Sequence, residues 1–516
     1  MEAFRTQDLA HWMPLLEATS DIAFELAATS EESLDHPQIA HNGDAITIED
    51  PVLGPVRQIG PVGHFSATPI DPARSAPALG AGDGAFVPPL PLTGAGPAPA
   101  HPFAGTTVIE FGCFYAMPYA TTMLAALGAR VIKIEDAAGD PHRLSFGPDV
   151  ATNKTTAGKE SISVDLRTEE GRRVAQDIVA RADVFVTGYR SGVAERLGLG
   201  EDDLRALNPR LLFVHGAGYG ADGPYAKRAL YAQAAQAVGG SFGRQVGPWT
   251  RPEASLDMSV MELQVIVLPR LGQVVDGDSN AALALLAALA LGIFHQRRTG
   301  EGQRLLTSMI AGNALAYSDD FCSYAGKPPT LLCDDEYWGT DALNRCYPAA
   351  EDSFVCLAVR TEGELSALVA TIGLPELATD ERFATADARQ ANDDALIAEL
   401  GKRFADKPAA EWEAMLLAHD VGCVEANMAG QPVITSFDPK LREAGLTLAY
   451  EHPVFGEMVR AGVPVAFSET PGRIGMPCTR GEHNHALLAE IGRTADDIAQ
   501  LEASGVIVPP RPAVAS

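Results

Sequence analysis

Apolar residues in the middle of the chain form two alternating patterns. Short runs rich in β-branched residues predict strands, and longer runs with helical spacing predict helices between them. The predicted strands are Thr106–Phe111, Arg130–Glu135, Ser161–Leu166, Val184–Thr187 and Leu211–His215, and the predicted helices include Pro118–Leu127 and Glu169–Arg181. Because strands that alternate with helices form parallel sheets covered on both faces, we expect an α/β fold with a doubly wound, mostly parallel sheet.

The pattern changes after about residue 325. A strand at Arg304–Thr307 and a helix at Met309–Asp319 complete a large α/β domain, which we place at residues 104–325. Residues 330–440 carry short strands and amphipathic helices, which predict a smaller α+β domain. We expect residues 441–516 to return the chain to the large domain.

The longest strongly apolar run, residues 281–294, follows the tetrapeptide Gly277-Asp278-Ser279-Asn280. The run predicts a buried helix and is too short to cross a bilayer. Asp and Ser are preferred helix N-caps, so local chemistry favours a capping role for Asp278. A carboxylate at a helix N-terminus can also serve as a nucleophile, and the tetrapeptide alone leaves both roles open.

The first 70 residues resemble the C-terminal part of the chain. Trp12 and Glu25 match Trp412 and Glu425 at one constant offset, and three further stretches match in the same order. These are His36-Pro37-Gln38 with Asp438-Pro439-Lys440, Pro51-Val52-Leu53-Gly54 with Pro453-Val454-Phe455-Gly456, and Phe65-Ser66-Ala67-Thr68-Pro69 with Phe467-Ser468-Glu469-Thr470-Pro471. We interpret residues 1–70 as a partial internal repeat that suggests a tandem-derived chain, and the Pro/Gly/Ala-rich residues 71–103 as a linker.

Composition narrows the class of protein. The net charge of -28 argues against nucleic acid and against an anionic membrane surface as partners, because both require basic patches. The N-terminus lacks a basic segment followed by an apolar one, so we expect a cytoplasmic protein.

Two kinds of cofactor site are not indicated. The seven cysteines are scattered without metal-ligand spacing, which predicts reduced thiols and no metal, and Cys113 is expected to be structural. The first turn from strand to helix reads Gly112-Cys-Phe-Tyr-Ala-Met-Pro118 and lacks the dinucleotide-binding glycine pattern, so we expect no nucleotide redox cofactor.

Several motifs over residues 104–500 together resemble the class III coenzyme A transferase family, which also contains carnitine-metabolism enzymes and α-methylacyl-CoA racemases. The matching stretches appear in the family's order. They are Val131-Ile-Lys-Ile-Glu135, Gly139-Asp140-Pro141, Ser161-Ile-Ser-Val-Asp-Leu166, Ala182-Asp183-Val184, Gly192-Val-Ala-Glu-Arg-Leu197-Gly198, Leu207-Asn-Pro-Arg210, Gly223-Pro-Tyr-Ala226, Arg298-Thr-Gly-Glu-Gly-Gln303 and Gly481-Glu-His483.

The resemblance implies a chemistry for Asp278. In family members that transfer CoA, the nucleophile is an aspartate at this position, in a Gly-Asp segment before the helix that leads to the Arg-Thr-Gly turn. The implied reaction moves CoA from an acyl-CoA to a carboxylic acid through an aspartyl anhydride and an aspartyl-CoA thioester. We expect the helix N-terminus to keep the Asp278 carboxylate ionised and to supply N–H groups to developing oxyanions.

The resemblance also implies a CoA site. Phe114, Tyr115 and Ala116 would line the pantetheine path. The adenosine and its phosphates would be surrounded by Val164, Arg167, Gly188, Tyr189, Arg196 and Leu197. Arg167 and Arg196 suit phosphate because the guanidinium group is a permanently charged, forked donor, although surface salt bridges explain either residue as well.

The chain departs from the family at two positions. Ala232 follows Tyr231 where members usually carry an acid, and the racemase branch uses that acid for proton transfer. Asp136 stands where some members have a basic residue that contacts CoA phosphate. The missing acid at Ala232 argues against racemisation, and an acid at Asp136 would repel phosphate. The alternatives to a transferase are an acyl-CoA isomerase or racemase of the same fold, and a non-catalytic subunit of a heteromeric transferase, which both departures permit.

The family's interlocked dimers imply that this chain forms a homodimer or a heteromer with a homologous chain.

Overall fold

The structure is a computed structural model of the chain, and it describes residues 2–19, 21–71, 74–82, 99–145, 151–247, 258–271, 276–426, 436–452 and 456–510. Two compact units divide these residues. Unit 1 comprises residues 1–242, 272–327 and 440–516, and unit 2 comprises residues 243–271 and 328–439. Residues 243–271, which we had expected in the large domain, group with the small one. Most of the expected linker, residues 72–73 and 83–98, lies outside the described residues.

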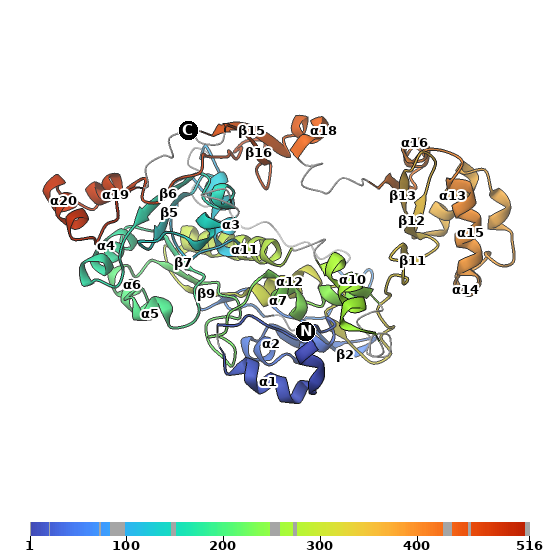
Figure 1. The fold of residues 1–516 in the computed structure, drawn as a ribbon, viewed down its shortest axis with the longest axis horizontal. Coiled ribbons are helices and arrows are strands. Elements are labelled where there is room, and N and C mark those ends of the chain that lie inside the picture. The colour runs from blue at the N-terminus through green and yellow to red at the C-terminus, as the bar shows by residue number, and fades with distance from the viewer. Residues whose placement is uncertain are drawn as a thin grey trace. The chain divides into compact units, whose positions relative to one another are not determined.

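A seven-stranded sheet forms the centre of unit 1 (Figure 1). Its order is β3-β9-β8-β7-β4-β5-β6, and all neighbours run parallel except β3, which pairs antiparallel with β9. The strands are β3 (His64–Phe65), β9 (Arg304–Leu306), β8 (Leu212–His215), β7 (Val184–Thr187), β4 (Thr107–Phe111), β5 (Arg130–Glu135) and β6 (Lys159–Ser163). The expected doubly wound, mostly parallel sheet is therefore present.

Successive residues of each strand pack into separate hydrophobic cores, because their side chains point to opposite faces of the sheet. On one face, Ile109 and Phe111 pack with helices α4 (Glu169–Val179), α6 (Glu201–Leu207), α19 (Asn484–Glu490) and α20 (Ala495–Ala503). On the other face, Val108 packs with helices α3 (Ala116–Ala126) and α11 (Gly277–Thr299). The sheet is thus buried on both sides, which explains its continuous apolar strands.

Helix α11 begins four residues earlier than the apolar run predicted. In the described part of the chain it is the one helix long and apolar enough to cross a membrane by length and composition alone, and half of its apolar window is buried. Ala282, Leu285, Leu289 and Ile293 lie in the core against the sheet. The helix accordingly serves as a core helix of unit 1.

Five other helices of unit 1 connect or flank these elements, namely α1 (Leu9–Glu17), α2 (Pro37–Asn42), α5 (Val193–Arg196), α7 (Ala232–Val238) and α12 (Met309–Ala316). Helices α8 (Ser241–Val246) and α18 (Pro439–Glu443) contain boundaries between the two units. Short 3-10 helices lie at Glu2–Thr6, Glu32–Asp35, Pro141–Leu144, Ala151–Asn153 and Pro375–Ala378.

Unit 2 contains an antiparallel sheet of order β11-β12-β13-β14, made of Gly339–Asp341, Asn344–Pro348, Phe354–Ala358 and Gly422–Glu425. Its helices are α10 (Val260–Leu271), α13 (Glu362–Thr371), α14 (Ala386–Ala391), α15 (Asp393–Phe404) and α16 (Ala409–Leu417). Tyr347, Phe404 and Trp412 are fully buried at the centre of its core.

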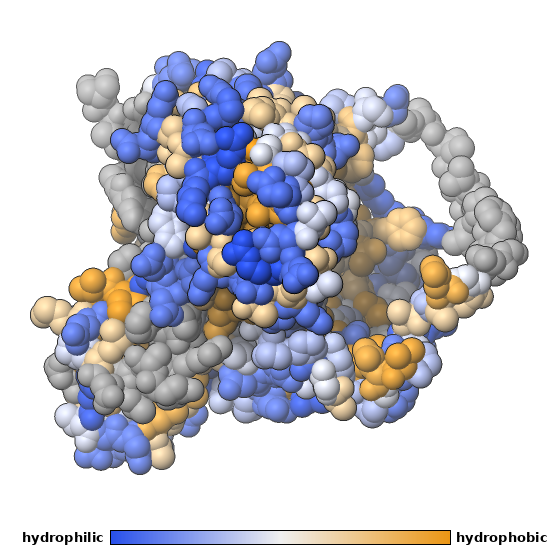
Figure 2. Space-filling view, turned by 90° about the vertical axis from the view of Figure 1, so that its right-hand side faces the viewer, coloured by the Kyte–Doolittle hydropathy of each residue, from blue (hydrophilic) through white to orange (hydrophobic). Residues whose placement is uncertain are grey.

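The side of the molecule shown in Figure 2 is mostly hydrophilic, with hydrophobic residues in separate small groups, as the acidic composition leads one to expect.

Elements of the N-terminal segment recur near the C-terminus. Strands β1 (Ala45–Asp50) and β2 (Gly54–Ile59) form an antiparallel hairpin, and β15 (Thr447–His452) and β16 (Gly456–Ala461) form another in which each strand begins 402 residues later. The Trp12 indole donates to the Phe4 carbonyl at 3.1 Å, and the Trp412 indole donates to the Phe404 carbonyl at 2.9 Å. The two segments thus share local structure as well as sequence.

Candidate functional site

The carboxyl ends of β4 and β7 meet at the point where the chain order of the sheet reverses. Strands β5 and β6 extend the sheet on one side of β4, and β7, β8 and β9 extend it on the other. Such a switch point creates a crevice outside the strand ends and is the usual ligand site of doubly wound sheets. Gly112 and Gly188 follow β4 and β7, and a Cβ on Gly112 would lie 3.3 Å from the Gly188 nitrogen and 2.0 Å from Met117.

The turn after β4 has an unusual backbone. Phe114 has a φ of 65°, in the left-handed region that non-glycine residues rarely adopt. Its backbone N–H donates to an Asp140 carboxylate oxygen at 3.0 Å, and its ring is 37% exposed. Since such a conformation persists only when its surroundings fix it, the turn is a preorganised feature.

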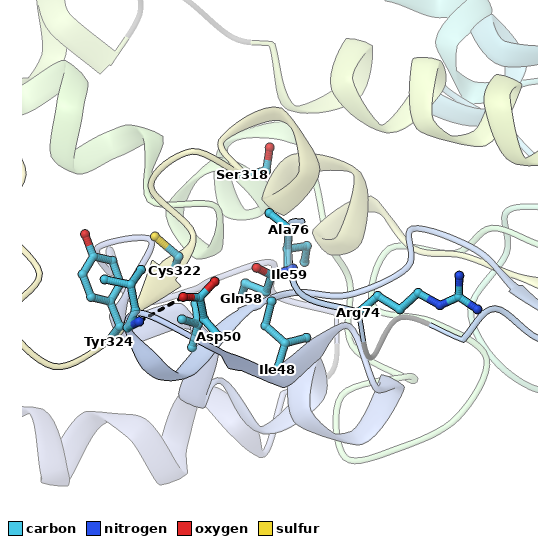
Figure 3. A pocket seen from close by; sticks show the side chains of 11 residues that line it. Ile48, Asp50, Gln58, Ile59, Arg74, Ala76, Ser318, Cys322 and Tyr324 are labelled. Atoms are coloured by element: carbon cyan, nitrogen blue, oxygen red, sulfur yellow. Dashed lines mark hydrogen bonds between the residues drawn. The ribbon is translucent and has the colours of Figure 1, made fainter. Parts of the chain in front are cut away.

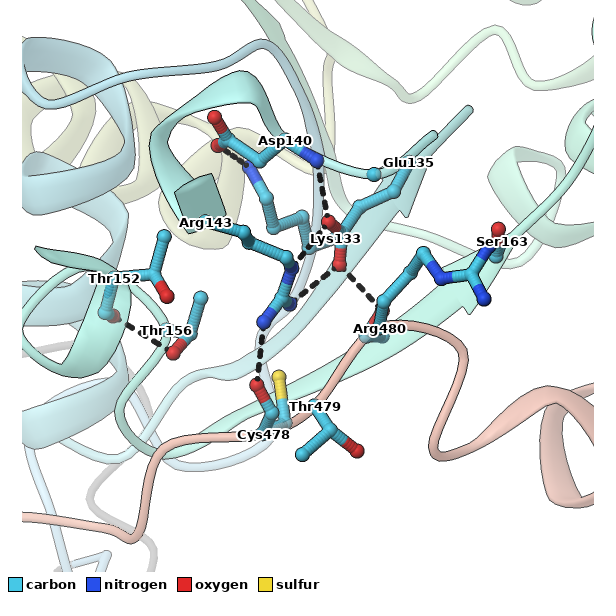
Figure 4. A network of polar contacts seen from close by, with 12 residues as sticks. Lys133, Glu135, Asp140, Arg143, Thr152, Thr156, Ser163, Cys478, Thr479 and Arg480 are labelled. Carbon is cyan, nitrogen blue, oxygen red and sulfur yellow. Dashed lines mark hydrogen bonds and ion pairs between the residues drawn. The ribbon is translucent and has the colours of Figure 1, made fainter. Parts of the chain in front are cut away.

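A buried network of charges fixes this turn (Figure 4). Lys133 of β5 lies 2.7 Å from Glu110 and 2.9 Å from Asp140, and donates to the Gly112 carbonyl at 2.9 Å. Lys159 contacts Glu110 as well. Burial disfavours the charged form of Glu110, but the two lysines outweigh it and lower the pKa of that carboxyl.

A second part of the network joins the sheet to the C-terminal chain. Arg143 holds Glu135 through contacts of 2.7 and 2.8 Å and donates to the Cys478 carbonyl at 3.1 Å, as Figure 4 shows. Burial opposes ionisation of Glu135, yet the hydrogen bonds from Arg143 lower its pKa to about 2. The pair therefore stays ionised and links β5 to residue 478.

The N-terminus of α11 is held by side chains from two neighbouring helices. Asp276 occupies the N-cap position, and its carboxylate accepts from Gln236 at 2.6 Å and from the Tyr317 hydroxyl at 2.9 Å. Asn313 of α12 donates to the Gly277 carbonyl at 2.9 Å. Because Asp276 occupies the cap position, Asp278 lies inside the first turn of the helix and is not its N-cap.

Asp278 is a half-buried carboxylate. Among the described residues, no hydrogen bond or ion pair to its side chain is present. Burial raises the pKa of the Asp278 carboxyl from 3.8 to about 6. The group is therefore ionised at neutral pH but poorly solvated, which increases the nucleophilicity of a carboxylate.

Aromatic side chains surround the first turn of α11. Burial raises the pKa of the Tyr115 hydroxyl, and Tyr119 and then the nearby charge of Asp278 raise it further. The Phe114 ring meets the Tyr231 ring edge-on at 5.8 Å. Tyr231 precedes Ala232, and a Cβ on Gly277 would lie 2.4 Å from the Ala232 carbonyl oxygen. The turn after β4, the start of α7 and the start of α11 thus meet at one place.

The residues expected around the adenosine and phosphates of CoA differ from one another in position and exposure. Gly188 and Tyr189 lie at the switch point, and the Tyr189 ring packs 4.7 Å from Phe111. Arg196, the last residue of α5, is exposed, and Leu197, which follows it, is partly buried. Val164 is fully buried in the hydrophobic core, so its side chain does not line a surface.

Arg167 is exposed and already paired. Its guanidinium contacts both carboxylate oxygens of Asp165 at 2.8 and 2.9 Å. Hydrogen bonds to Asp165, followed by the charges of Asp165 and Asp136, raise the pKa of Arg167. A phosphate at this position would compete with two carboxylates, so Arg167 is a weaker anion ligand than the sequence suggested.

Three residues of the site were not assigned a role from the sequence. Lys133 and Asp140 position Phe114, and the His142 ring lies 6.2 Å from Phe114 and 6.4 Å from Tyr115. A lysine inside a continuous apolar strand was the available signal, because a buried charge requires partners. Burial raises the pKa of Cys113 to about 11, which agrees with a structural cysteine.

No group of three or more His, Cys, Asp or Glu side chains that could hold a metal ion occurs among the residues placed by the structure.

Comparisons with known proteins point to one family. The family model for CoA-transferase family III matches residues 1–83 and 103–484. The formyl-CoA:oxalate CoA-transferases of Shigella sonnei (strain Ss046) and Escherichia coli O6:H1 are each 28% identical over 447 residues, which cover 79% of this chain and 99% of the relative.

Two solved structures are similar to this chain over about three quarters of its length. Rv3272 of Mycobacterium tuberculosis is 25% identical with a TM-score of 0.61, covering 76% of this chain and 100% of that one. A CaiB/BaiF family protein of Brucella suis is 26% identical with a TM-score of 0.59, and the match covers 76% of this chain and 99% of that one. About a fifth of this chain therefore exceeds the length of these relatives.

Proposed function

Because the chain belongs to CoA-transferase family III and is an enzyme that transfers CoA, we propose that it moves CoA from an acyl-CoA to a carboxylic acid through the Asp278 carboxylate. The observation that carries this proposal is the position of Asp278. It is a half-buried carboxylate without a partner among the described residues, in the first turn of a long helix, beside the switch point of the sheet.

The proposed reaction conserves the thioester. An Asp278 oxygen attacks the acyl carbonyl carbon, CoA leaves as the thiolate, and a mixed anhydride forms. The thiolate then attacks the Asp278 carbonyl carbon, which releases the first carboxylic acid and leaves an aspartyl-CoA thioester. The second acid repeats both steps in reverse order and regenerates the carboxylate.

The surrounding groups support these steps. The N-termini of α3 and α11 both begin beside Asp278, and their free N–H groups favour the negative charge that develops on a carbonyl oxygen. The Tyr115 ring, which lies 5.2 Å from the Tyr119 ring, forms one wall of the site. Exclusion of water from the half-buried carboxylate protects an anhydride from hydrolysis.

The residues present fit CoA in part. The exposed Phe114 ring and the preorganised turn after β4 offer an apolar and backbone surface for the pantetheine arm. Arg196 is exposed and available for a phosphate, whereas the Arg167 guanidinium is paired with Asp165. We therefore assign Arg196 the main phosphate contact.

A direct assay tests the proposal. Purified protein is incubated with formyl-CoA and isotopically labelled oxalate, the pair named by the relatives, and then with other acids, and labelled acyl-CoA is measured. We expect Asp278→Asn to lower the rate about a thousandfold or more. Asp393→Asn is the matched control, since burial also raises the pKa of that carboxyl but it lies in unit 2. Equal rates for wild type and Asp278→Asn would contradict the proposal.

The isomerase alternative has a separate signature. Ala232 is buried at 6% exposure and supplies no proton-transferring group. Exchange of the acyl α-hydrogen for deuterium in heavy water without any acceptor acid would support an isomerase or racemase. A chain that exchanges neither hydrogen nor CoA alone, but transfers CoA when a homologous chain is added, would support the non-catalytic subunit.

A further inference from the structure

Two cysteines of unit 2 lie directly opposite each other on neighbouring antiparallel strands. Cys346 of β12 pairs with Cys356 of β13 in the register of this hairpin. All seven cysteines of the chain are thiols in the structure. The spacing of the cysteines along the chain did not predict this pair, because the register of a hairpin depends on its turn.

The backbone hydrogen bonds show which kind of pair the two cysteines form. The Cys346 N–H donates to the Trp338 carbonyl at 2.7 Å, on the side away from β13. Three residues earlier, the Leu343 carbonyl accepts from the Val359 N–H of the β13 side at 2.9 Å. Because hydrogen-bonded and non-hydrogen-bonded pairs alternate along an antiparallel ladder, Cys346 and Cys356 form a non-hydrogen-bonded pair. Such pairs place their Cα atoms about 4.5 Å apart, within the range of roughly 4.4 to 6.8 Å that a disulfide bridges.

The two thiols lie on the opposite face of the sheet from the core of unit 2. The next residues along the strands, Tyr347 and Val355, point to the core and are buried. Cys346 and Cys356 are partly exposed, and Val424, which pairs with Cys356 from β14, is 48% exposed. The pair is therefore outside the hydrophobic core of unit 2 and partly accessible to solvent.

The surroundings keep the Cys346 thiol protonated at neutral pH. Burial, followed by the neighbouring Cys356 thiol, raises the pKa of Cys346, and Arg345 opposes this change. The effect of Cys356 is the one expected of two thiols that face each other across a ladder. Because the thiolate is the reactive form, the reduced pair reacts slowly and is the resting state.

We propose that Cys346 and Cys356 form a reversible disulfide by exchange with a low-molecular-weight disulfide, and that this bond locks β12 to β13. One protein thiolate attacks a sulfur of the small disulfide, which releases one small thiol and leaves a mixed disulfide. The other protein thiolate then attacks the protein sulfur of the mixed disulfide and releases the second small thiol. Two electrons pass to the small disulfide, and the two protons of the protein thiols end on the released small thiols.

The other cysteines of unit 2 are less suited to this bond. Cys423 lies in the core at 1% exposure, and its partner in the register is Leu357. Cys333 raises the pKa of Cys346 by less than Cys356 does, which places it farther from that thiol. Cys333 is accordingly the competing thiol that an experiment has to exclude.

Cys322 of unit 1 provides an internal control. It belongs to β10 (Cys322–Ser323), where it pairs with Gln58 of β2, and it is partly exposed. Figure 3 shows Cys322 beside a pocket of about 470 Å³, and among the described residues that line this pocket it is the one thiol. Cys322 can therefore take up a small thiol but has no second sulfur opposite it.

Mass mapping after thiol–disulfide exchange tests the pair in the full-length chain. Reduced protein is incubated with oxidised glutathione, quenched with acid, alkylated and digested with trypsin without reductant. Cleavage after Arg345 and Arg360 releases both cysteines on the single peptide 346–360. We expect this peptide without alkyl groups and lighter by two hydrogen atoms, with dithiothreitol reversing the change, while Cys322 carries glutathione or an alkyl group. A peptide 346–360 with both cysteines alkylated or glutathionylated, or linked to Cys333, would overturn the proposal.

Single variants separate the pair from general oxidation. In Cys356→Ser the mixed disulfide on Cys346 has no partner to resolve it, so we expect about fivefold or more glutathione on Cys346 than in the wild type. Cys333→Ser is the matched control and should leave the yield of the disulfide unchanged. Equal glutathione on Cys346 in the wild type and Cys356→Ser would contradict the pairing, and loss of the disulfide in Cys333→Ser would assign the bond to Cys333 instead.

Hydrogen–deuterium exchange tests the lock between the strands. Amide hydrogens of residues 344–358 should exchange about fivefold or more slowly in the oxidised protein than in the reduced one, because opening the hairpin then requires the linked strands to separate together. The hairpin of β15 and β16 contains no cysteine and should exchange equally in both forms. Equal exchange of residues 344–358 in the two forms would show that the bond does not lock the strands.

Discussion

The pKa of Asp278 connects the site's burial with its chemistry. The carboxyl has to be ionised to attack, and its pKa is raised to about 6 by burial. We expect kcat/KM to fall about tenfold per pH unit below pH 6 and to be level above pH 7. Rates measured from pH 4.5 to 8.5 with a non-ionising acyl group check this, and a profile that stays level down to pH 5 would contradict it.

The same shift predicts a gain in stability when the charge is removed. A raised pKa in the folded state means that stability is lost as the pH rises from 3.8 through 6, and the loss is complete above that range. Asp278→Asn should therefore increase the free energy of unfolding by about 1 to 3 kcal/mol at pH 7.5, with no difference below pH 3.5. Urea denaturation of the wild type and Asp278→Asn at the two pH values measures these free energies of unfolding. A lower free energy of unfolding for Asp278→Asn at pH 7.5 would show that the wild-type carboxylate is well solvated.

The sequence indicated the identity of this residue but not its local structure. Asp278 was found through its place among ordered family motifs, while its local chemistry favoured a cap. Asp276 occupies the N-cap position without a side-chain capping bond, and Gln236 and Tyr317, distant in sequence, hold its carboxylate instead. Contacts between distant segments leave no signal in a local pattern, and for the same reason the burial of the Val164 side chain was not predicted.

At the scale of the elements, the position of α11 depends on a small residue. A Cβ on Gly277 would lie 2.4 Å from the Ala232 carbonyl oxygen, so Gly277→Ala must displace the helix start or α7. We expect kcat/KM to fall about 10- to 100-fold, because displacement of a nucleophile by an ångström is enough for that loss. Gly243→Ala is the matched control, since nothing lies within 4 Å of its added Cβ. Steady-state kinetics measure kcat/KM for both variants. Unchanged activity of Gly277→Ala would mean that the close approach of Gly277 to the Ala232 carbonyl does not position Asp278.

The bounds of two strands were predicted correctly, whereas the starts of two helices were not. Strands β5 and β7 have the predicted bounds, because fully buried parallel strands show as continuous β-branched runs. Helix α3 begins at Ala116, two residues before the predicted start at Pro118, and α11 begins at Gly277. Both starts are fixed by neighbouring segments, so the apolar pattern alone could not locate them.

At the scale of the whole molecule, the buried charge network sets global stability. Lys133 is fully buried between Glu110 and Asp140. Lys133→Met would leave two carboxylates without that partner, and we expect the free energy of unfolding to fall by about 3 to 5 kcal/mol. Arg173→Ala, which removes an exposed pair with Glu169, should change it by less than about 1 kcal/mol. Urea denaturation of both variants measures this, and equal effects would show that the network is solvated.

Residues 1–70 and the C-terminal part of the chain share sequence matches and an antiparallel hairpin. The relatives that this chain matches are covered almost completely by about four-fifths of the chain, and the N-terminal segment is matched by the same family model. The sequence repeat predicted similar local structure in both segments. The contacts of Gln38 and Asn42 with the backbone of residues 219–225 could not be predicted, because they join residues that are distant in sequence.

The central claim is that Asp278 forms a covalent bond to the acyl group and then to CoA. Incubation with an acyl-CoA, trapping with hydroxylamine and peptide mass mapping test it most directly. We predict a hydroxamate on Asp278 that forms only with acyl-CoA and is absent in Asp278→Asn. An enzyme that transfers CoA under the same conditions while Asp278 remains unmodified would contradict the account.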